Sequence, residues 1–214
     1  GQKTGLIGTI ETIIGDERIP SVNTTPESYV VQESFRKMAD AGCKNVVMEV
    51  SSQGLMLHRV GGFTFDYGMF TNLAEDHIGE NEHKDMEDYI HCKSLLFQQC
   101  RQGIVNGDDE YVDRILKDHT CEVETFGMDS SNDVYAENVE LIQEPGYLGL
   151  AYDLKGKQEY RVAVDIPGDF TVYNSLAAIS LCRHMGIVKE DVLEALNSIQ
   201  VKGRLEIVKT PGEY

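Results

Sequence analysis

The segment "TTPESYVVQESFRKMADAGCKNVVMEV", residues 24–50, decides the fold. Its first part has apolar side chains three to four residues apart, at Val31, Phe35 and Met38. This spacing is typical of a helix with one buried face, and the run "NVVMEV" (45–50) that follows is typical of a buried strand. A similar run, "GLIGTI" (5–10), precedes the helix. The pattern therefore predicts a strand–helix–strand unit whose two strands are parallel.

The ends of this helix have their own signals. Thr25 is suited to the N-cap, where its hydroxyl would accept a backbone N–H, and Pro26 is suited to the first helical position. Gly42 marks the end, because glycine readily adopts the left-handed conformation that closes many helices. We expect the helix to run from Pro26 to the residues just before Gly42.

Strands and helices continue to alternate up to about residue 120. "DYGMF" (66–70) and "GIVN" (103–106) are predicted strands. The helix between them is predicted to begin after Asp85, with Glu87 and Asp88 in its first turn, where acidic side chains are favoured. Strands that are connected through helices form parallel sheets. We predict an α/β fold with a mostly parallel, helix-covered sheet.

The pattern changes after residue 120, where segments of alternating apolar and polar residues are separated by turn signals. They are the predicted strands of a smaller antiparallel β patch, at 121–127, 134–142, 148–154 and 160–166. Two more helices are predicted at 171–186 and 189–199, and a last strand at 204–208.

Composition excludes several classes of protein. Acidic residues outnumber basic ones by 36 to 19, which gives a net charge of −17, and no run of Lys or Arg follows any segment. We therefore expect no nucleic-acid partner. No apolar run approaches the roughly 18 residues of a membrane span, and the five cysteines lack the C-x-x-C pairing of a zinc site. We expect a cytoplasmic protein with no membrane partner.

Polar side chains follow two of the predicted strands, at the end where α/β sheets bind ligands. Glu49 is the penultimate residue of the strand 45–50, and Asp76 and His77 lie in the loop after the strand 66–70. We expect these side chains to reach the same edge of the sheet and to form a ligand site. The alternative for Glu49 is that it caps the helix that follows it.

Lys93 has an unusual position on its predicted helix. It stands among apolar residues spaced three and four apart, namely Tyr89, Ile90, Leu96 and Phe97. One interpretation is that its stem packs against apolar groups while its amine reaches water. The other is that burial favours the neutral amine, which can react with carbon dioxide. The resulting carbamate is an anionic oxygen ligand, of the kind that Mg²⁺ prefers.

Several segments occur in the order and approximate spacing that is found in one protein family. They are "NTTPES" (23–28), "MEVSSQGLMLHRV" (48–60), "FDYGMFTNLAEDH" (65–77), "MEDYIHCKSLLF" (86–97), "IPGDFTVYNSLAAI" (166–179) and "GRLE" (203–206). Through them the chain resembles the central, P-loop-NTPase-like domain of the Mur ligases, most of all the members that add the third residue of the peptidoglycan stem peptide. The resemblance implies a central domain at 1–206 without its P-loop strand and helix, and the start of a linker at 207–214.

The resemblance also implies roles for individual residues. The catalytic residues, which would also hold Mg²⁺, would be Glu49, His77 and Lys93 as a carbamate. The residues that contact ATP would be Tyr89, Asn174 and Arg204. The residues that contact the muramoyl dipeptide would be Thr24, Thr25, Ser51 and Arg59. The loop after His77 is longer than is usual in the family, so His83 has no secure counterpart there.

The activity that the resemblance implies is an ATP-dependent ligation of an acid to an amino acid. ATP would phosphorylate the carboxylate of UDP-MurNAc-L-Ala-D-Glu, and the amine of 2,6-diaminopimelate or L-lysine would displace the phosphate. An amino-terminal domain for UDP and a carboxy-terminal domain for the amino acid would belong to the same polypeptide. Residues 1–214 contain no G-x-x-x-x-G-K-[ST] phosphate loop, so we expect this chain by itself to be inactive.

Two other classes of function remain open from the residues alone. A metal-dependent phosphohydrolase would use Glu49, Asp76, His77 and His83 without ATP. A noncatalytic interaction module would use the acidic surface instead. Activity on a phosphoester with metal alone would indicate the first class, and a partner that still binds after substitution of Glu49 and His77 would indicate the second.

Overall fold

The computed structural model describes residues 1–75, 77–80, 82–144 and 147–199. These residues form two compact units. Unit 1 comprises Gly1–Asp66, Ala74–Arg101 and Asp113–Cys121, and unit 2 comprises Tyr67–Leu73, Gln102–Val112 and the chain from Glu122 onward.

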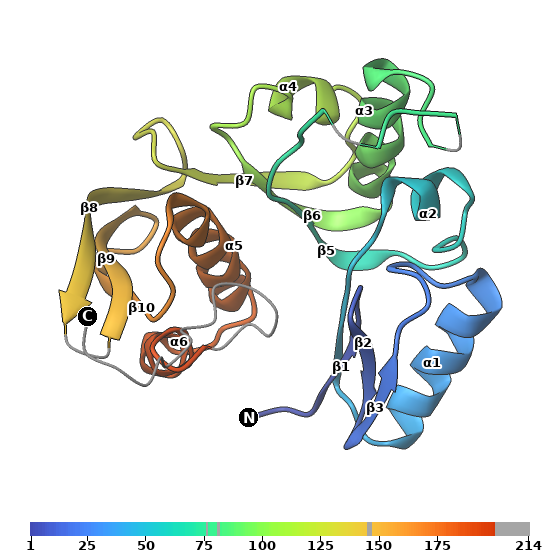
Figure 1. Ribbon diagram of the computed structural model, residues 1–214, viewed down its shortest axis with the longest axis horizontal. Coiled ribbons are helices and arrows are strands. Elements are labelled where there is room, and N and C mark those ends of the chain that lie inside the picture. The colour runs from blue at the N-terminus through green and yellow to red at the C-terminus, as the bar shows by residue number, and fades with distance from the viewer. Residues whose placement is uncertain (76, 81, 145–146, 200–214) are drawn as a thin grey trace, which may run out of the picture. The chain divides into compact units, whose positions relative to one another are not determined.

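Unit 1 contains a four-stranded sheet in the order β3-β2-β1-β4. Its strands are β1 (Thr4–Ile7), β2 (Glu11–Ile14), β3 (Glu17–Pro20) and β4 (Asn45–Met48). β1 pairs with β4 in parallel, so the predicted strand–helix–strand unit is confirmed. The helix α1 (Ser28–Asp40) lies against this sheet (Figure 1). The core between helix and sheet contains Ile7, Ile14 and Met38.

The sequence analysis misses the hairpin formed by β2 and β3. The predicted strand 5–10 ends at Ile7, and β1, β2 and β3 pair antiparallel one after another. β2 and β3 are joined by the two residues Gly15 and Asp16, and Gly15 has a φ of 65°. A Gly-Asp pair between two short apolar runs is a recognised hairpin signal, because glycine tolerates the positive φ that such a tight turn requires. That signal could have identified the hairpin.

The predicted start of α1 is wrong and its predicted end is confirmed. The helix begins at Ser28 after Glu27, which makes no side-chain capping bond. Thr25 is not the cap, because its hydroxyl bonds to the residues that follow β4 instead. The helix ends at Asp40, and Gly42 has a φ of 81°. This left-handed conformation favours glycine and ends the helix as expected.

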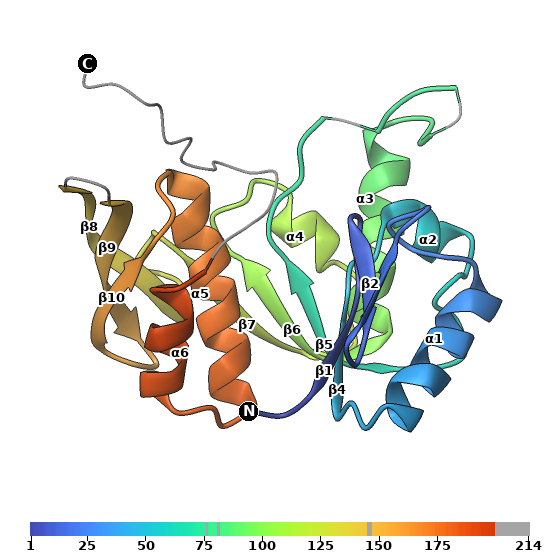
Figure 2. The same cartoon turned by 60° about the horizontal axis from the view of Figure 1, so that its bottom comes forward.

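The remaining elements of unit 1 are mostly helical. They are α2 (Ser52–Met56), α3 (Met86–Ser94) and the 3₁₀ turn η1 (Leu95–Gln98), and the short helix α4 (Val112–Ile115) follows. α3 begins as predicted, because the Asp85 side chain accepts the backbone N–H of Asp88. α2 and α3 lie side by side (Figure 2). Their proximity positions the loop that precedes α3 near the loop that precedes α2.

Unit 2 is built on a six-stranded sheet in the order β10-β9-β8-β7-β6-β5. Its strands are β5 (Phe65–Phe70), β6 (Cys100–Asn106), β7 (Glu122–Gly127), β8 (Val134–Glu144), β9 (Tyr147–Gly156) and β10 (Tyr160–Val164). β6, β7 and β8 are parallel, whereas β8, β9 and β10 are antiparallel. An α/β fold with a mostly parallel sheet and a smaller antiparallel patch is therefore confirmed.

Three details of the predicted sheet are wrong. The segment 121–127 was assigned to the antiparallel patch, but β7 pairs in parallel with both of its neighbours. The strands predicted to share one parallel sheet are divided between two sheets, because β4 pairs with β1 and β5 pairs with β6. Nor is β4 the buried strand that its apolar run suggests, since Val46 and Val47 are 40% and 50% exposed. An apolar run indicates a strand, but it does not show which strand lies beside it or what covers it.

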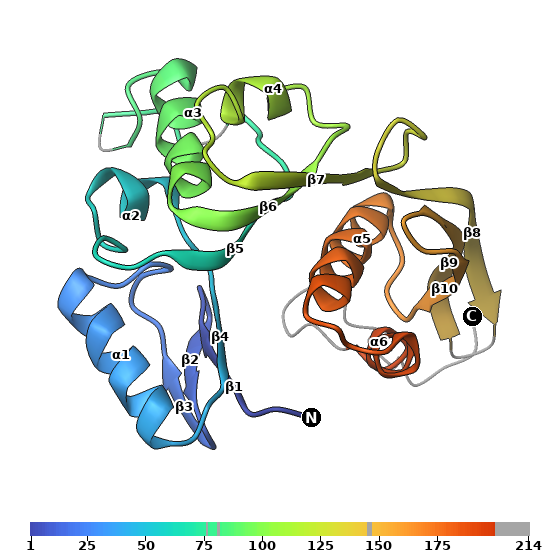
Figure 3. The ribbon, with the colours of Figure 1, turned by 180° about the vertical axis from the view of Figure 1, so that it is seen from behind.

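Helices α5 (Asp169–His184) and α6 (Lys189–Leu196) confirm the two predicted C-terminal helices and pack against the strands of the antiparallel patch (Figure 3). Tyr152 is at the centre of this core with no exposed surface, and its hydroxyl lies 2.8 Å from that of Ser175. Burial raises the pKa of Tyr152 above its usual value. The predicted strand 204–208 lies outside the described residues. Within the described residues, no helix has both the length and the apolar composition that crossing a membrane requires.

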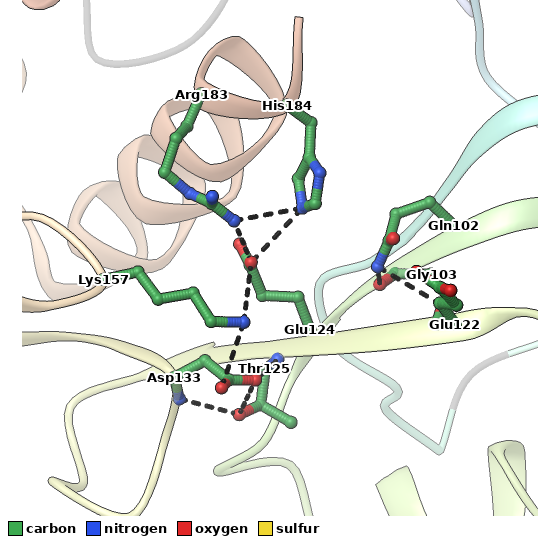
Figure 4. A network of polar contacts seen from close by, with 9 residues as sticks. All are labelled: Gln102, Gly103, Glu122, Glu124, Thr125, Asp133, Lys157, Arg183 and His184. Carbon is green, nitrogen blue, oxygen red and sulfur yellow. Dashed lines mark hydrogen bonds and ion pairs between the residues drawn. The ribbon is translucent and has the colours of Figure 1, made fainter. Parts of the chain in front are cut away.

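A buried carboxylate ties α5 to the sheet of unit 2. Glu124 on β7 is 1% exposed, and three basic side chains point toward it, from Lys157, Arg183 and His184 (Figure 4). Lys157 Nζ lies 3.1 Å and His184 Nε2 lies 3.2 Å from Glu124 Oε2, and Arg183 donates to the same oxygen. A buried charge is tolerated only when it is paired in this way.

We expect Glu124→Gln to lower the free energy of unfolding by about 1–3 kcal/mol, because it removes the buried anion to which three partly exposed basic side chains bond. Urea unfolding followed by circular dichroism measures this. The matched control is Glu122→Gln on the same strand, where the side chain is exposed, and the expected change is below about 0.5 kcal/mol. Equal effects of the two substitutions would show that the network contributes no stability.

Candidate active site

A cavity of about 480 Å³ in unit 1 brings together most of the residues that the sequence analysis selects. It is bounded by the turn before α1, the end of β4, the start of α2, the loop before α3 and α3 itself. The predicted site residues that line it are Thr24, Thr25, Glu49, Ser51, Arg59, His77, Tyr89 and Lys93. Additional lining residues are Thr9, Asn23, Val50, Ser52, Gln53 and Glu82.

Glu49 directly follows β4, and its backbone N–H bonds to Ile7 O, which extends the pairing of β1 with β4 by one residue. Its side chain is exposed to the cavity and accepts a hydrogen bond from the Thr9 hydroxyl. It does not cap α2, because Ser51 is the N-cap residue and accepts the Gly54 N–H. The capping alternative for Glu49 is therefore wrong.

Thr25 holds the turn before α1 against the junction between β4 and α2. Its side chain is almost fully buried, with the residue 1% exposed. The hydroxyl donates to Glu49 O at 3.1 Å and accepts the Ser51 N–H at 2.8 Å. Thr24 Oγ1 lies 3.1 Å from Thr9 Oγ1, which in turn bonds to Glu49. Thr25 and Ser51 therefore line the cavity while their hydroxyls also stabilise its wall.

Arg59 supplies a positive charge at the cavity wall, with its side chain 17% exposed. One terminal nitrogen donates to Thr25 O at 3.1 Å, and the other lies 2.7 Å from a Glu27 carboxylate oxygen. Among the described residues its Nε, which is buried, has no hydrogen-bond partner. The guanidinium thus already holds one carboxylate at the cavity wall, as a site for an acidic ligand requires.

His77 lines this cavity from the loop before α3. Its Nδ1 is 3.2 Å from Glu82 Oε1, and its side chain is 59% exposed. The residue has a φ of 58°, in the left-handed region that is uncommon for residues other than glycine. Such a conformation persists where the surrounding structure enforces it, which is frequent at functional sites.

Lys93 and Tyr89 form the wall that α3 contributes. Tyr89 is 4% exposed, and its ring lies 6.0 Å from that of His77 and 5.2 Å from Lys93 Nζ. Lys93 is half-buried at the cavity and not enclosed by apolar side chains. Its amine lies near an aromatic face, at the distance of a cation–π contact. The carbamate at Lys93 stays a prediction.

The residues around the cavity fit a Mg²⁺ ion. Gly8 leaves room for the Glu49 carboxylate, since a Cβ at Gly8 would come within 2.8 Å of Glu49 Oε1. A carboxylate, an imidazole and hydroxyls line the same space, and oxygen ligands are those that Mg²⁺ prefers. Glu49, His77 and Lys93 line this cavity together.

A second cavity, of about 750 Å³, lies within unit 2 and contains the predicted residue Asn174. Phe170 and Tyr173 of α5 line it, together with Asn106 and Asp108 after β6. Tyr173 donates to Asp108 Oδ2 at 3.1 Å. Burial, together with this carboxylate, raises the pKa of Tyr173 to about 12. An aromatic wall beside amide and carboxylate groups is suited to a planar, hydrogen-bonding ligand.

Asn174 is thus separate from the residues of the first cavity. Arg204, a further predicted ATP contact, lies outside the described residues, and so does Asp76.

Comparison with known protein families shows to which family the chain belongs. Residues 1–182 match the family model described as the Mur ligase middle domain. The chain belongs to the Mur ligase family.

Curated Mur ligases of two species illustrate the relationship, and both are named UDP-N-acetylmuramoyl-L-alanyl-D-glutamate–2,6-diaminopimelate ligase. One from Clostridium acetobutylicum is 41% identical over 209 residues, which are 97% of this chain and 42% of the relative. Another, from Caldanaerobacter subterraneus subsp. tengcongensis, is 40% identical over 213 residues, or 99% of this chain and 43% of the relative. The chain therefore spans less than half the length of these Mur ligases.

Solved structures show the same fold. A UDP-N-acetylmuramoyl-L-alanyl-D-glutamate–2,6-diaminopimelate ligase superposes with a TM-score of 0.86 at 21% identity, over 98% of this chain and 43% of that one. A D-alanyl-D-alanyl-adding ligase from Acinetobacter baumannii superposes with a TM-score of 0.65 at 22% identity, over 82% of this chain and 40% of that one. At these identities the likeness concerns the fold alone.

His83 is the residue whose position the sequence could not assign. It has no exposed surface and does not line the cavity of this Mur ligase domain. Its Nε2 lies 2.7 Å from Ser52 Oγ, its Nδ1 lies 3.1 Å from Asp88 Oδ2, and its ring stacks on Tyr89 at 4.8 Å. The hydrogen bond from His83 lowers the pKa of Asp88. A phosphohydrolase that uses His83 in the same site as Glu49 is therefore not supported.

Gly54 is the residue of α2 whose substitution most directly tests the packing of the site wall. A Cβ at Gly54 would lie 2.6 Å from Thr25 Cγ2 and 3.1 Å from Ser51 Oγ. We expect Gly54→Ala to lower the free energy of unfolding by about 1–2 kcal/mol through overpacking, despite the higher helix propensity of alanine. Gly79→Ala is the control, since its Cβ would meet only Glu82 Oε2, at 3.9 Å. Thermal melting of both variants measures the change in stability. A Gly54→Ala variant that is more stable than the unmodified chain would contradict the prediction.

Proposed function

We propose that this chain is the ATP-binding middle part of a ligase that adds the third amino acid to UDP-MurNAc-L-Ala-D-Glu. The observation that carries the proposal is the cavity of unit 1, where Glu49, His77 and Lys93 face Thr24, Thr25, Ser51 and Arg59. Family membership and the names of the curated relatives point in the same direction. The domain would extend over residues 1–206, and 207–214 would begin a linker to a further domain of the same polypeptide.

The proposed reaction activates a carboxylate and then transfers it to an amine. The substrate carboxylate attacks the γ-phosphorus of ATP and forms an acyl phosphate, with ADP as the leaving group. The amine of 2,6-diaminopimelate or L-lysine then attacks the acyl carbon, phosphate leaves, and the amine proton passes to solvent. Mg²⁺ held by Glu49 and His77 would neutralise the negative charges of the phosphate oxygens.

The other residues of this cavity would bind and orient the acidic substrate. Arg59 lines the cavity and already pairs with the exposed carboxylate of Glu27, which an acidic group of the substrate could replace. Ser51 and Thr24 contribute hydroxyls from two sides of the cavity. Tyr89 shields Lys93 from one side. Asn174 and Tyr173 offer an amide and an aromatic face for the ATP base, and Arg204 would contact an ATP phosphate.

Lys93 is proposed to act as a carbamate. Its neutral amine would attack carbon dioxide, form an N–C bond and release one proton to solvent, which gives an anionic oxygen ligand beside Glu49 and His77. Mg²⁺ bound beside it would stabilise the carbamate, because Mg²⁺ prefers anionic oxygen ligands.

The decisive experiment uses the full-length protein that carries this domain. With ATP, Mg²⁺, UDP-MurNAc-L-Ala-D-Glu and diaminopimelate or lysine, phosphate release is expected with one of the two amino acids. Lys93→Ala should lower turnover by about 10²–10³-fold, the cost of losing one group that stabilises developing charge. Added formate or acetate should restore part of it by supplying an oxygen ligand.

The control is Lys44→Ala, because Lys44 is exposed and does not line the cavity. Normal turnover of Lys93→Ala would contradict the role of Lys93. The absence of phosphate release by the unmodified protein with either amino acid would contradict the proposed function itself.

The chain of 214 residues alone is expected to bind Mg-ATP poorly and to catalyse no ligation. A phosphate loop provides several backbone N–H donors and a lysine to the ATP phosphates, and no G-x-x-x-x-G-K-[ST] sequence occurs in these residues. Titration calorimetry measures the affinity, with the full-length protein as the comparison. Micromolar binding of Mg-ATP by the chain alone would contradict this expectation.

A further inference from the structure

A compact group of metal-ligating side chains lies beside the Mg²⁺ cavity but outside it. The group, which we name the His–Asp–Cys cluster, consists of His83, Asp88 and Cys92. One ligand atom of each residue lies within 4.8 Å of the other two. Among the described residues, this is the one group of three or more His, Cys, Asp or Glu side chains that meets that distance. Neither His83, Asp88 nor Cys92 lines the cavity that contains Glu49 and His77.

The three side chains converge for simple structural reasons. Asp88 and Cys92 are four residues apart on α3, so they lie on one face of the helix. His83 reaches them from the loop before α3, and this loop folds back on itself because the His83 N–H bonds to His77 O and the Gly79 N–H bonds to His83 O. The shortest separation within the cluster is 3.1 Å, between His83 Nδ1 and Asp88 Oδ2.

The position of the His83 ring is fixed in the way that metal-binding histidines require. Its second ring nitrogen, Nε2, lies 2.7 Å from Ser52 Oγ, and its face stacks on Tyr89 with 20° between the ring planes. Histidine ligands of metals almost always bond through their other ring nitrogen to a nearby polar group, which fixes the tautomer and the ring orientation. Without metal, Nδ1–H of His83 donates to the Asp88 carboxylate. On metal binding the ring proton would move to Nε2, where Ser52 Oγ can accept it, and the Nδ1 lone pair would become available to the ion.

The donor set differs from that of the Mg²⁺ cavity. A thiolate, an imidazole and a carboxylate are ligands of Zn²⁺, whereas Mg²⁺ prefers oxygen. His83 has no exposed surface and Cys92 is 3% exposed, while the Asp88 side chain is 25% exposed. His83 and Cys92 therefore form the enclosed side of the cluster. Asp88 forms the exposed side, through which an ion and a water molecule can enter.

We propose that His83, Asp88 and Cys92 form a binding site for a soft divalent cation such as Zn²⁺, with water in the fourth position. In tetrahedral zinc sites the ligand atoms lie about 3.3–3.8 Å apart, given metal–ligand distances of about 2.0–2.3 Å. Side-chain movements of about 1 Å bring a cluster bounded by 4.8 Å to that geometry. On binding, the Cys92 thiol releases its proton to solvent, and Nδ1 of His83 and the carboxylate of Asp88 donate lone pairs.

A bound ion would link the loop that carries His77 to α3, through His83 on one side and Asp88 and Cys92 on the other.

Cobalt(II) spectroscopy of the reduced 214-residue chain tests the proposal, because a cobalt–thiolate bond gives a charge-transfer band in the near ultraviolet. We expect the band to saturate at one equivalent of Co²⁺ and to disappear on addition of one equivalent of Zn²⁺. A large excess of Mg²⁺ should leave it unchanged. Cys92→Ser should abolish the band, and Asp88→Asn should weaken cobalt binding by at least about tenfold.

Two control variants separate this site from others. Cys121→Ser removes a different, partly exposed cysteine and should retain the band. Glu49→Gln removes a residue of the Mg²⁺ cavity and should also retain it, so the result does not depend on the proposed ligase function. Thermal melting in the absence of metal establishes that each variant is folded, and Zn²⁺ should raise the melting temperature of the unmodified chain and of Cys121→Ser but not that of His83→Gln.

Three results would overturn the proposal. The first is cobalt binding by the unmodified chain without a thiolate band. The second is a band that persists in Cys92→Ser. The third is competition by Mg²⁺ at concentrations comparable to those of Co²⁺, which would assign the bound ion to the cavity of Glu49 and His77.

Discussion

The geometry of the candidate site depends on one hydroxyl group, that of Thr25. It donates to Glu49 O and accepts the Ser51 N–H, so it satisfies two backbone groups at the point where β4 ends and α2 begins. Valine has nearly the same shape but no hydroxyl, so it could bond neither to Glu49 O nor to the Ser51 N–H. Polar groups that are left unpaired at a buried position lower the stability of the fold. Gly54 faces the Thr25 methyl group so closely that no other side chain fits there without movement. Arg59 bonds to the Thr25 carbonyl, so the positive charge of the site is fixed to the same residue.

Tyr89 has a corresponding role on α3. Its ring stacks on His83 and lies beside His77 and Lys93, so it separates the enclosed His–Asp–Cys cluster from the open cavity. The same ring lies 5.2 Å from Lys93 Nζ, so it also forms part of the surroundings of the proposed carbamate.

Unit 2 contains a buried carboxylate that is paired with basic side chains. Glu124 lies in the core of the sheet with Lys157, Arg183 and His184 around a single carboxylate oxygen. These groups come from β7, from the turn between β9 and β10, and from the end of α5, so one carboxylate connects segments far apart in sequence. The cavity with Asn174 lies in the same unit, at the beginning of α5, where Asp108 fixes Tyr173.

The sequence by itself determined the features that depend on neighbouring residues. The helical spacing of Val31 and Met38, the left-handed end at Gly42 and the cap at Asp85 are all local, because each involves backbone groups within a few positions. The family motifs also selected the residues that line the first cavity. Only the tertiary structure decided which strands pair, that Thr25 bonds across to Glu49 and Ser51, and that His83 is enclosed beside Asp88 and Cys92. These outcomes depend on contacts between segments that are distant in the sequence. The free energy of such a contact depends on how deeply it is buried and on which other groups compete for it, and a local sequence pattern carries no information on either.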